Sequence, residues 1–384
     1  MLEFIWIFFC ILSMGFIINI FFKNSIEINE SMLSRENNLD GFRYFLASFV
    51  AFHHSYLSIN FFKYGEWSHT ISFENYIGGF GVAVFFIISG YLFAEIPFKK
   101  NNWKDFYIKR FFRIAPMAYI SSLICIIISI ILFGITDFIK LLFWLDAGLF
   151  NFRPNFNNFH FSSSINAGVT WSLQWEWLFY FSLPLLSILF KKDNIKNTII
   201  YLIIFLILTY ILIYFKKPSY IQIILFSWYF TIGFISKKII KARISNKIRI
   251  KKTNLNIISL ALLMACFLIG SNTDHFFILK IKYLLPILYA LLFFSIVLGA
   301  NWFGLLTNYG FRLLGDASYS IYLIHGIFWF LLNTACYSLK IFNNSILYYI
   351  LSFFTWTFIC LCSIFFYRRI ELPFINYSKN LTKK

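Results

Sequence analysis

The sequence predicts an all-α protein, a polytopic transmembrane bundle of about eleven helices. Three observations predict this class. Of the 384 residues, 60% are hydrophobic and only 13% are charged. Apolar runs of about 20 residues, the length that crosses the hydrocarbon core of a bilayer, recur along the whole chain. Positive charge gathers in alternate loops between these runs, as in multi-pass membrane proteins.

Each expected span is an apolar run bounded by polar or charged residues. The first run lacks the basic residues and the small-residue cleavage site of a secretory signal peptide, so we expect a retained helix that is additional to a ten-helix core. The short run at 220–236 is the weakest of the set. The expected spans are 2–22, 41–62, 77–96, 115–134, 170–190, 197–215, 220–236, 254–270, 281–300, 318–339 and 345–367.

The net charge of +18 predicts orientation rather than nucleic-acid binding. Alternate loops carry 25 of the 34 Lys and Arg residues, and the positive-inside rule places these loops in the cytoplasm. The N-terminus is then outside and the C-terminus cytoplasmic. The basic loops are 23–40, 97–114, 191–196, 237–253, 301–317 and 368–384.

Arg43 and His54 are the most informative pair of residues. They are eleven positions apart on one expected helix, so they point the same way and lie roughly 16 Å apart along its axis. Charged and titratable side chains inside a membrane span usually line a site or a path. His53 is turned about 100° away, and an interhelical hydrogen bond is the favoured interpretation for it.

Glu176 is the carboxylate that lies well inside an expected span. If its helix begins at the outer surface, Glu176 lies about 9 Å deep, at the level of His54, so the two could form a base and its orienting acid. A structural role for Glu176 remains an alternative. His325 is expected nearer the cytoplasm, where a role in lining a donor tunnel competes with simple packing.

Two further motifs lie toward the cytoplasmic side. Arg110 and Arg113 are three positions apart, so one helical face would present both guanidiniums to a phosphate or pyrophosphate; membrane anchoring is the alternative. Ser89 and Gly90 allow close approach of a ligand or of another helix, and this signal is weak by itself. The six cysteines show no metal-site spacing, and we expect no metal.

Taken together, these motifs resemble the acyltransferase 3 family of integral-membrane O-acyltransferases. The resemblance runs from about residue 39 to residue 375. The motifs that carry it are Leu39-Asp-Gly-Phe-Arg43 with His54, Phe85-Phe-Ile-Ile-Ser-Gly-Tyr-Leu92, Arg110-Phe-Phe-Arg-Ile-Ala-Pro116, Trp171-Ser-Leu-Gln-Trp-Glu176, Ser318 to His325, and Arg369-Ile-Glu-Leu-Pro-Phe374.

The resemblance implies a bacterial cytoplasmic-membrane enzyme. It implies transfer of an acyl group, usually acetyl, from cytoplasmic acyl-CoA to a hydroxyl of an extracytoplasmic or lipid-linked glycan such as O-antigen, capsule or exopolysaccharide. Arg43 and His54 would be essential, and Arg110 and Arg113 would assist the donor. We add Ser89, Gly90 and His325 to the expected donor site, and Trp171 and His160 to an acceptor site beside the long segment 135–169.

The expected organisation has three parts: an additional helix and linker at 1–38, the acyltransferase-like domain at 39–375, and a basic tail at 376–384. The expected partners are membrane lipid, acyl-CoA as a donor substrate and a glycan, with no permanently bound cofactor and no nucleic acid. Direct attack by the hydroxyl and a transient acyl-histidine both fit the residues. A transporter or flippase of a lipid-linked glycan, with Arg43, His54 and Glu176 as a relay, is the alternative function. The sequence leaves the oligomeric state and the acylated sugar open.

Overall fold

A computed structural model defines the helices of the chain. It describes residues 2–23, 37–68, 72–99, 101–134, 138–156, 159–189, 195–214, 218–241, 251–271 and 284–382. Within these ranges the regular structure is helical, apart from one isolated β-bridge between Phe156 and Phe159. Parts of the expected basic loops, at 24–36, 191–194 and 242–250, lie outside the described residues.

A helix lies at each of the eleven expected spans, and the predicted helical membrane bundle is confirmed. By length and composition, seven segments of the described chain could cross a membrane, and two shorter apolar helices accompany them. The eleven helices are α1 (Leu2–Phe22), α3 (Asn37–Tyr64), α4 (Ser72–Phe93), α5 (Trp103–Phe133), α7 (Trp171–Leu189), α8 (Ile195–Tyr214), α9 (Pro218–Lys241), α11 (Lys252–Ser271), α12 (Leu284–Val297), α14 (Ser318–Ser338) and α15 (Ser345–Phe366).

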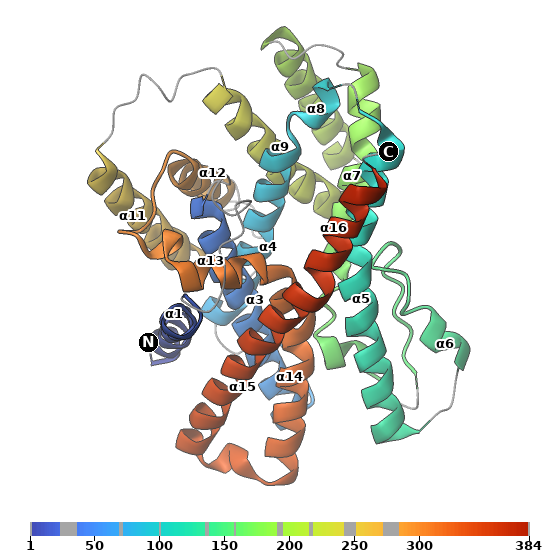
Figure 1. Ribbon diagram of the computed structural model, residues 1–384, viewed down its shortest axis with the longest axis vertical. Helices are drawn as coiled ribbons and strands as arrows, with labels where there is room; N and C mark the ends of the chain where they lie inside the picture. The colour runs from blue at the N-terminus through green and yellow to red at the C-terminus, as the bar shows by residue number, and fades with distance from the viewer. Residues whose placement is uncertain are drawn as a thin grey trace.

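Helix α3 is the centre of the bundle and packs on α4, on α14 and on the short helix α13 (Tyr309–Asp316) (Figure 1). Gly41 of α3 and Gly315 of α13 allow the backbone of α3 to pass very close to the backbone of the segment that contains α13. A Cβ on Gly41 would collide with the carbonyl oxygen of Leu306, and one on Gly315 with that of Asp40. Small residues allow helix backbones to approach closely in membranes. Asp40, Ser48 and His54 of α3 are buried among these helices.

Helices α4 and α9 form a second close pair. A Cβ on Gly90 would collide with the backbone of Phe230, and a Cβ on Gly233 with the backbone of Ile87. The two glycines thus face each other's helix at the same crossing, as small residues do in tight membrane-helix pairs. The structure assigns Gly90 to this packing.

Helix α5 begins twelve residues before the expected span, at Trp103, where the side chain of Asn102 caps it by accepting the N–H of Lys104. Arg110 and Arg113 therefore lie on a helix rather than in a loop, and Pro116 lies inside it. The helix therefore extends beyond the expected span and includes the end of the expected basic loop 97–114.

The segment between α5 and α7 turns back into the bundle. It contains α6 (Phe138–Leu142) and the short η2 (Ser162–Asn166), and a Cβ on Gly326 of α14 would collide with the backbone of Asn166. Gly326 follows His325 directly, so the start of α7 lies at the level of the central histidines.

The C-terminal part of the chain forms one long rod in which α15, the π-helical turn η5 (Tyr367–Glu371) and α16 (Leu372–Leu381) follow one another (Figure 1). The rod packs against α5. Such π-turns are frequent at functional sites, and this one buries the carboxylate of Glu371, whose residue is 1% exposed.

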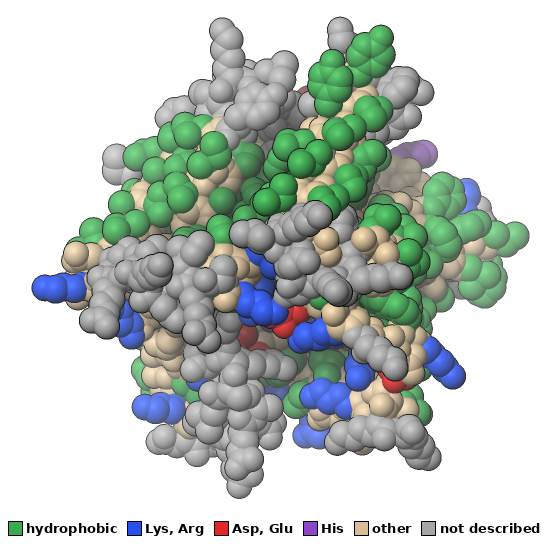
Figure 2. All heavy atoms as spheres, turned by 90° about the horizontal axis from the view of Figure 1, so that it is seen from above, with side chains coloured by type: hydrophobic (Ala, Val, Ile, Leu, Met, Phe, Trp, Pro, Cys, Tyr) green, Lys and Arg blue, Asp and Glu red, His purple; other side chains and the backbone are tan. Residues whose placement is uncertain are grey.

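The outer surface separates by polarity. Figure 2 shows Lys and Arg side chains spread over one half of the face in view, with Asp and Glu between them near the middle, and hydrophobic side chains over the other half. Large exposed apolar side chains on α5, α8 and α15 suit contact with lipid.

Candidate active site

Two imidazoles meet in the centre of the bundle. His54 of α3 and His325 of α14 are 271 positions apart, and Nδ1 of His54 lies 2.9 Å from Nε2 of His325. Both residues are buried, with 8% and 0% of their surface exposed. The rings are near-parallel, with centroids 5.1 Å apart.

The hydrogen bonds fix the tautomers of this pair in its neutral state. Nδ1 of His325 lies 2.9 Å from the carbonyl oxygen of Ile321, which can only accept, so this nitrogen carries the proton. Nε2 of His325 then accepts the N–H of His54 Nδ1. The lone pair of His54 consequently resides on Nε2, as a general base requires.

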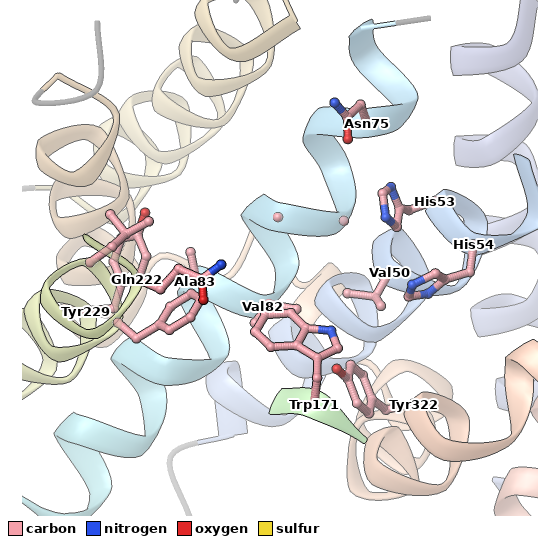
Figure 3. A pocket seen from close by; sticks show the side chains of 14 residues that line it. Val50, His53, His54, Asn75, Val82, Ala83, Trp171, Gln222, Tyr229 and Tyr322 are labelled. Carbon is pink, nitrogen blue, oxygen red and sulfur yellow. The ribbon is translucent and has the colours of Figure 1, made fainter. Parts of the chain in front are cut away.

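A cavity of about 300 Å³ opens beside His54. In Figure 3, Val50, His53 and His54 of α3 face Gln222 and Tyr229 of α9 across it, while Trp171 and Tyr322 lie side by side at one edge. Gly78 and Gly79 of α4 supply a wall without side chains. The size and the few polar groups suit a small-molecule site.

Trp171, which we expected in the acceptor site, lies on the cavity wall. The next residue fixes the first turn of α7, because the hydroxyls of Ser172 and Tyr322 are 2.7 Å apart. Tyr322 also donates to the carbonyl oxygen of Val169. His160 is exposed and does not line this cavity.

His53 lines the same cavity but bonds differently. Its Nδ1 donates to the backbone carbonyl oxygen of Glu74, at 2.8 Å. Gly78 leaves room for the ring, since a Cβ there would collide with it. His53 therefore makes the interhelical hydrogen bond, between α3 and α4, that the sequence favoured.

A second cluster gathers at the other end of the Arg43 face. Arg113 and Glu371 form an ion pair of 2.5 Å between α5 and η5, and Ser320 donates to the same carboxylate. The charges that act on Arg43 come from Arg113 and from three acidic residues, Asp40, Asp316 and Glu371. Two guanidiniums thus lie close together, roughly 16 Å from His54 at the usual helical rise.

Arg110 belongs to the same end but has aromatic neighbours. Its guanidinium lies 4.9 Å from the ring centroid of Phe93 and 5.9 Å from that of Tyr180. The phenol of Tyr180 hydrogen-bonds with Glu176 and with Arg110. Glu176 is therefore linked to an arginine of the basic cluster through one phenol.

This placement corrects the expected pairing of Glu176 with His54. The hydrogen-bond partner of Glu176 is Tyr180, and that of His54 Nδ1 is His325. The estimate of equal depth assumed that α7 starts at the membrane surface. Because η2 folds inward, α7 starts at the histidine level and Glu176 lies more than one turn beyond it, toward Arg113.

Three residues gained importance only from the structure. His325 was expected in a donor tunnel, but it bonds directly to His54. Glu371 lies in a quoted motif yet received no role, and Tyr322 was read only as part of the run before His325. Ser89 and Gly90 are absent from the cavity wall. The sequence holds one signal for this placement: Ser318 and His325 are seven positions apart, about two helical turns, so both lie on the same face of their helix.

Comparisons with known proteins identify the family of the chain. A model of the acyltransferase domain family matches residues 36–365. Nodulation protein 10 of Rhizobium leguminosarum bv. viciae is 27% identical over 177 residues, which are 43% of this chain and 47% of that protein, so the similarity spans about half of the relative. No solved structure matches. With the family match covering most of its length, the chain belongs to the acyltransferase 3 family.

Proposed function

We propose that the protein transfers an acyl group, with acetyl as the first candidate, from acyl-CoA to a hydroxyl of an extracytoplasmic or lipid-linked glycan. The observation that carries this proposal is the imidazole pair on the wall of a cavity, with a lone pair on Nε2 of His54. The family supplies the reaction class.

In the proposed step, Nε2 of His54 takes the proton of the sugar hydroxyl as its oxygen attacks the thioester carbonyl carbon. The C–O bond forms, the C–S bond breaks, and the CoA thiolate takes the proton from the imidazolium. His325 orients the His54 ring by accepting a hydrogen bond from the N–H group at Nδ1 of His54. The same geometry serves a transient acyl-histidine, in which Nε2 is the nucleophile.

The donor would approach from the end that carries the arginines. Arg43 and Arg113 lie close together, so their two guanidiniums could both bind one anionic phosphate. Glu176 would act here, by holding Tyr180 against Arg110, rather than at the transfer step. At roughly 16 Å, the distance to His54 calls for a donor with a long arm between phosphates and thioester, as in CoA.

The test is release of CoA from acetyl-CoA by purified protein that also receives the acceptor glycan. We expect His54→Ala to lower this rate by about 10²- to 10⁴-fold, the usual contribution of a general base. His53→Asn, whose amide can still donate to the carbonyl oxygen of Glu74, should retain most of it. An equal loss in both variants at equal membrane abundance would contradict the assignment.

The same assay separates the transporter alternative. A flippase moves its glycan without cleaving a thioester, so wild-type protein would release no CoA above the rate of empty membranes. Mass spectrometry of a His54 peptide after brief exposure to acetyl-CoA distinguishes direct attack from an acyl-histidine, because only the second leaves an acetylated ring.

A further inference from the structure

A second cavity, of about 230 Å³, lies between α1, the C-terminal half of α3 and the start of α15. Residues 52, 56, 59, 60 and 63 of α3 line it, a spacing that keeps them on one face of the helix. His54 and Val50, on the opposite face of the same half of α3, line the first cavity. Glu3 and Trp6 of α1 close the second cavity, and both precede the matched residues 36–365.

A pair of carboxyl groups marks this cavity as a binding site. Glu74 is 2% exposed, and Glu3 lines the same cavity. One carboxyl oxygen of Glu74, Oε1, is buried without a hydrogen-bond partner. A buried polar atom of this kind costs free energy unless something satisfies it.

The other lining groups define what could satisfy it. Aromatic rings of Trp6, Tyr56 and Tyr349 face the space, and the ring centroids of Trp6 and Tyr349 are 5.2 Å apart. Lys63 lies with its ammonium 5.2 Å from the centroid of Phe342. Flat apolar faces beside carboxyl, ammonium and hydroxyl groups match a sugar ring, which presents C–H groups on its faces and hydroxyls at its rim.

Other small ligands fit this chemistry less well. A lipid chain would leave the buried carboxyl group of Glu74 without a partner. An anionic ligand would lie beside the acidic side chains of Glu3 and Glu74, which do not favour it. The volume of about 230 Å³ suits a single sugar unit rather than an oligosaccharide.

The two cavities share a wall. The backbone carbonyl of Glu74 accepts the hydrogen bond of His53, whose ring lines the first cavity, while the side chain of Glu74 lines the second. We propose that the second cavity binds one sugar unit of the acceptor glycan, so that a neighbouring unit presents its hydroxyl to His54. This inference rests on the proposed glycan acceptor.

The test compares two variants in the full-length protein. Glu74→Gln retains the shape of the side chain but replaces its carboxyl group by an amide. We expect it to raise KM for the acceptor glycan about tenfold, as for the loss of a hydrogen bond, with kcat and the KM for acetyl-CoA unchanged. Trp6→Leu should do the same. Phe21→Leu, on the exposed side of α1, is the matched control and should leave all three constants unchanged.

A binding measurement keeps the outcome independent of catalysis. Saturation-transfer NMR with a panel of free monosaccharides should show contact with wild-type protein and loss of it in Glu74→Gln and Trp6→Leu. An unchanged acceptor KM together with unchanged sugar contact in both variants would overturn the site. CoA release by wild-type protein would still stand in that case. Its absence, with sugar contact intact, would instead reject the proposed function.

Discussion

At the scale of single residues, the hydrogen bond between His54 and His325 decides which nitrogen can act. The hydrogen bond from His325 Nδ1 to the carbonyl oxygen of Ile321 fixes the tautomer of His325. The bond between the two rings then fixes the tautomer of His54. His325 is thus a positioning residue, acting through His54, in the manner in which an acceptor orients a catalytic imidazole in hydrolases.

Replacement of His325 should therefore lower the rate without weakening donor binding. We expect His325→Leu to reduce kcat roughly 10- to 100-fold, because the Nδ1 proton of His54 loses its acceptor and the ring its orientation. His325→Gln, whose side-chain oxygen can accept, should recover part of this loss. Steady-state kinetics with acetyl-CoA provide the check. Equal rates for the Leu and Gln variants would point to a packing role.

Arg113 and Glu371 form the ion pair that holds the rod to α5. Arg113→Gln leaves a carboxylate buried without its countercharge, which costs about 3–5 kcal/mol. We expect a clear drop in melting temperature in detergent for this variant and recovery of much of it in Arg113→Gln with Glu371→Gln. Arg369→Gln, at an exposed neighbouring position, is the control. A melting temperature that stays the same in Arg113→Gln would show that the pair contributes little.

At the scale of elements, the segment from α6 to η2 sets the depth of α7 and so the place of Glu176. Its fold depends on Asp146, which accepts from the N–H groups of Gly148 and Phe150 and forms an ion pair of 2.6 Å with Arg153. Trp177 of α7 donates to the carbonyl oxygen of Ala147 in the same turn. The turn around Asp146 therefore anchors α7.

Acid should loosen this anchor. Burial raises the pKa of Asp146, but the Arg153 guanidinium and the backbone N–H groups outweigh it and hold the pKa below the ordinary 3.8. The carboxylate therefore stabilises the fold at pH values above 3.8, and this contribution is lost as the pH falls through the lower folded pKa.

Melting temperatures measured from about pH 6 to about pH 3 check this expectation. Asp146→Asn should be less stable than wild-type protein at the upper end, and the difference should shrink as the pH falls below 3.8 toward the lower folded pKa. Glu66→Gln, at an exposed position, should follow wild-type protein throughout. A constant gap between Asp146→Asn and wild-type protein at every pH would reject the role of the charge.

At the scale of the whole molecule, the uneven distribution of Lys and Arg predicts that the arginine cluster faces the cytoplasm. Single cysteines can test this on intact spheroplasts with a membrane-impermeant thiol reagent. We expect Leu339→Cys, exposed between α14 and α15, to react, and Lys379→Cys, exposed on α16, to react only after permeabilisation. The native cysteines are buried or half-buried and give a low background. The reverse pattern would place the donor side outside.

The sequence by itself determined the helices, the family resemblance and the shared face of Arg43 and His54. Hydropathy and helical period are local properties, so they can be read along the chain. The tertiary structure alone decided which residues meet. His54 finds His325 and Glu176 finds Tyr180 because the depth and rotation of each helix depend on packing against distant segments, such as Gly326 against Asn166. Hydropathy along the chain does not show that the segment before α7 folds into the bundle, so it cannot give the depth at which α7 begins.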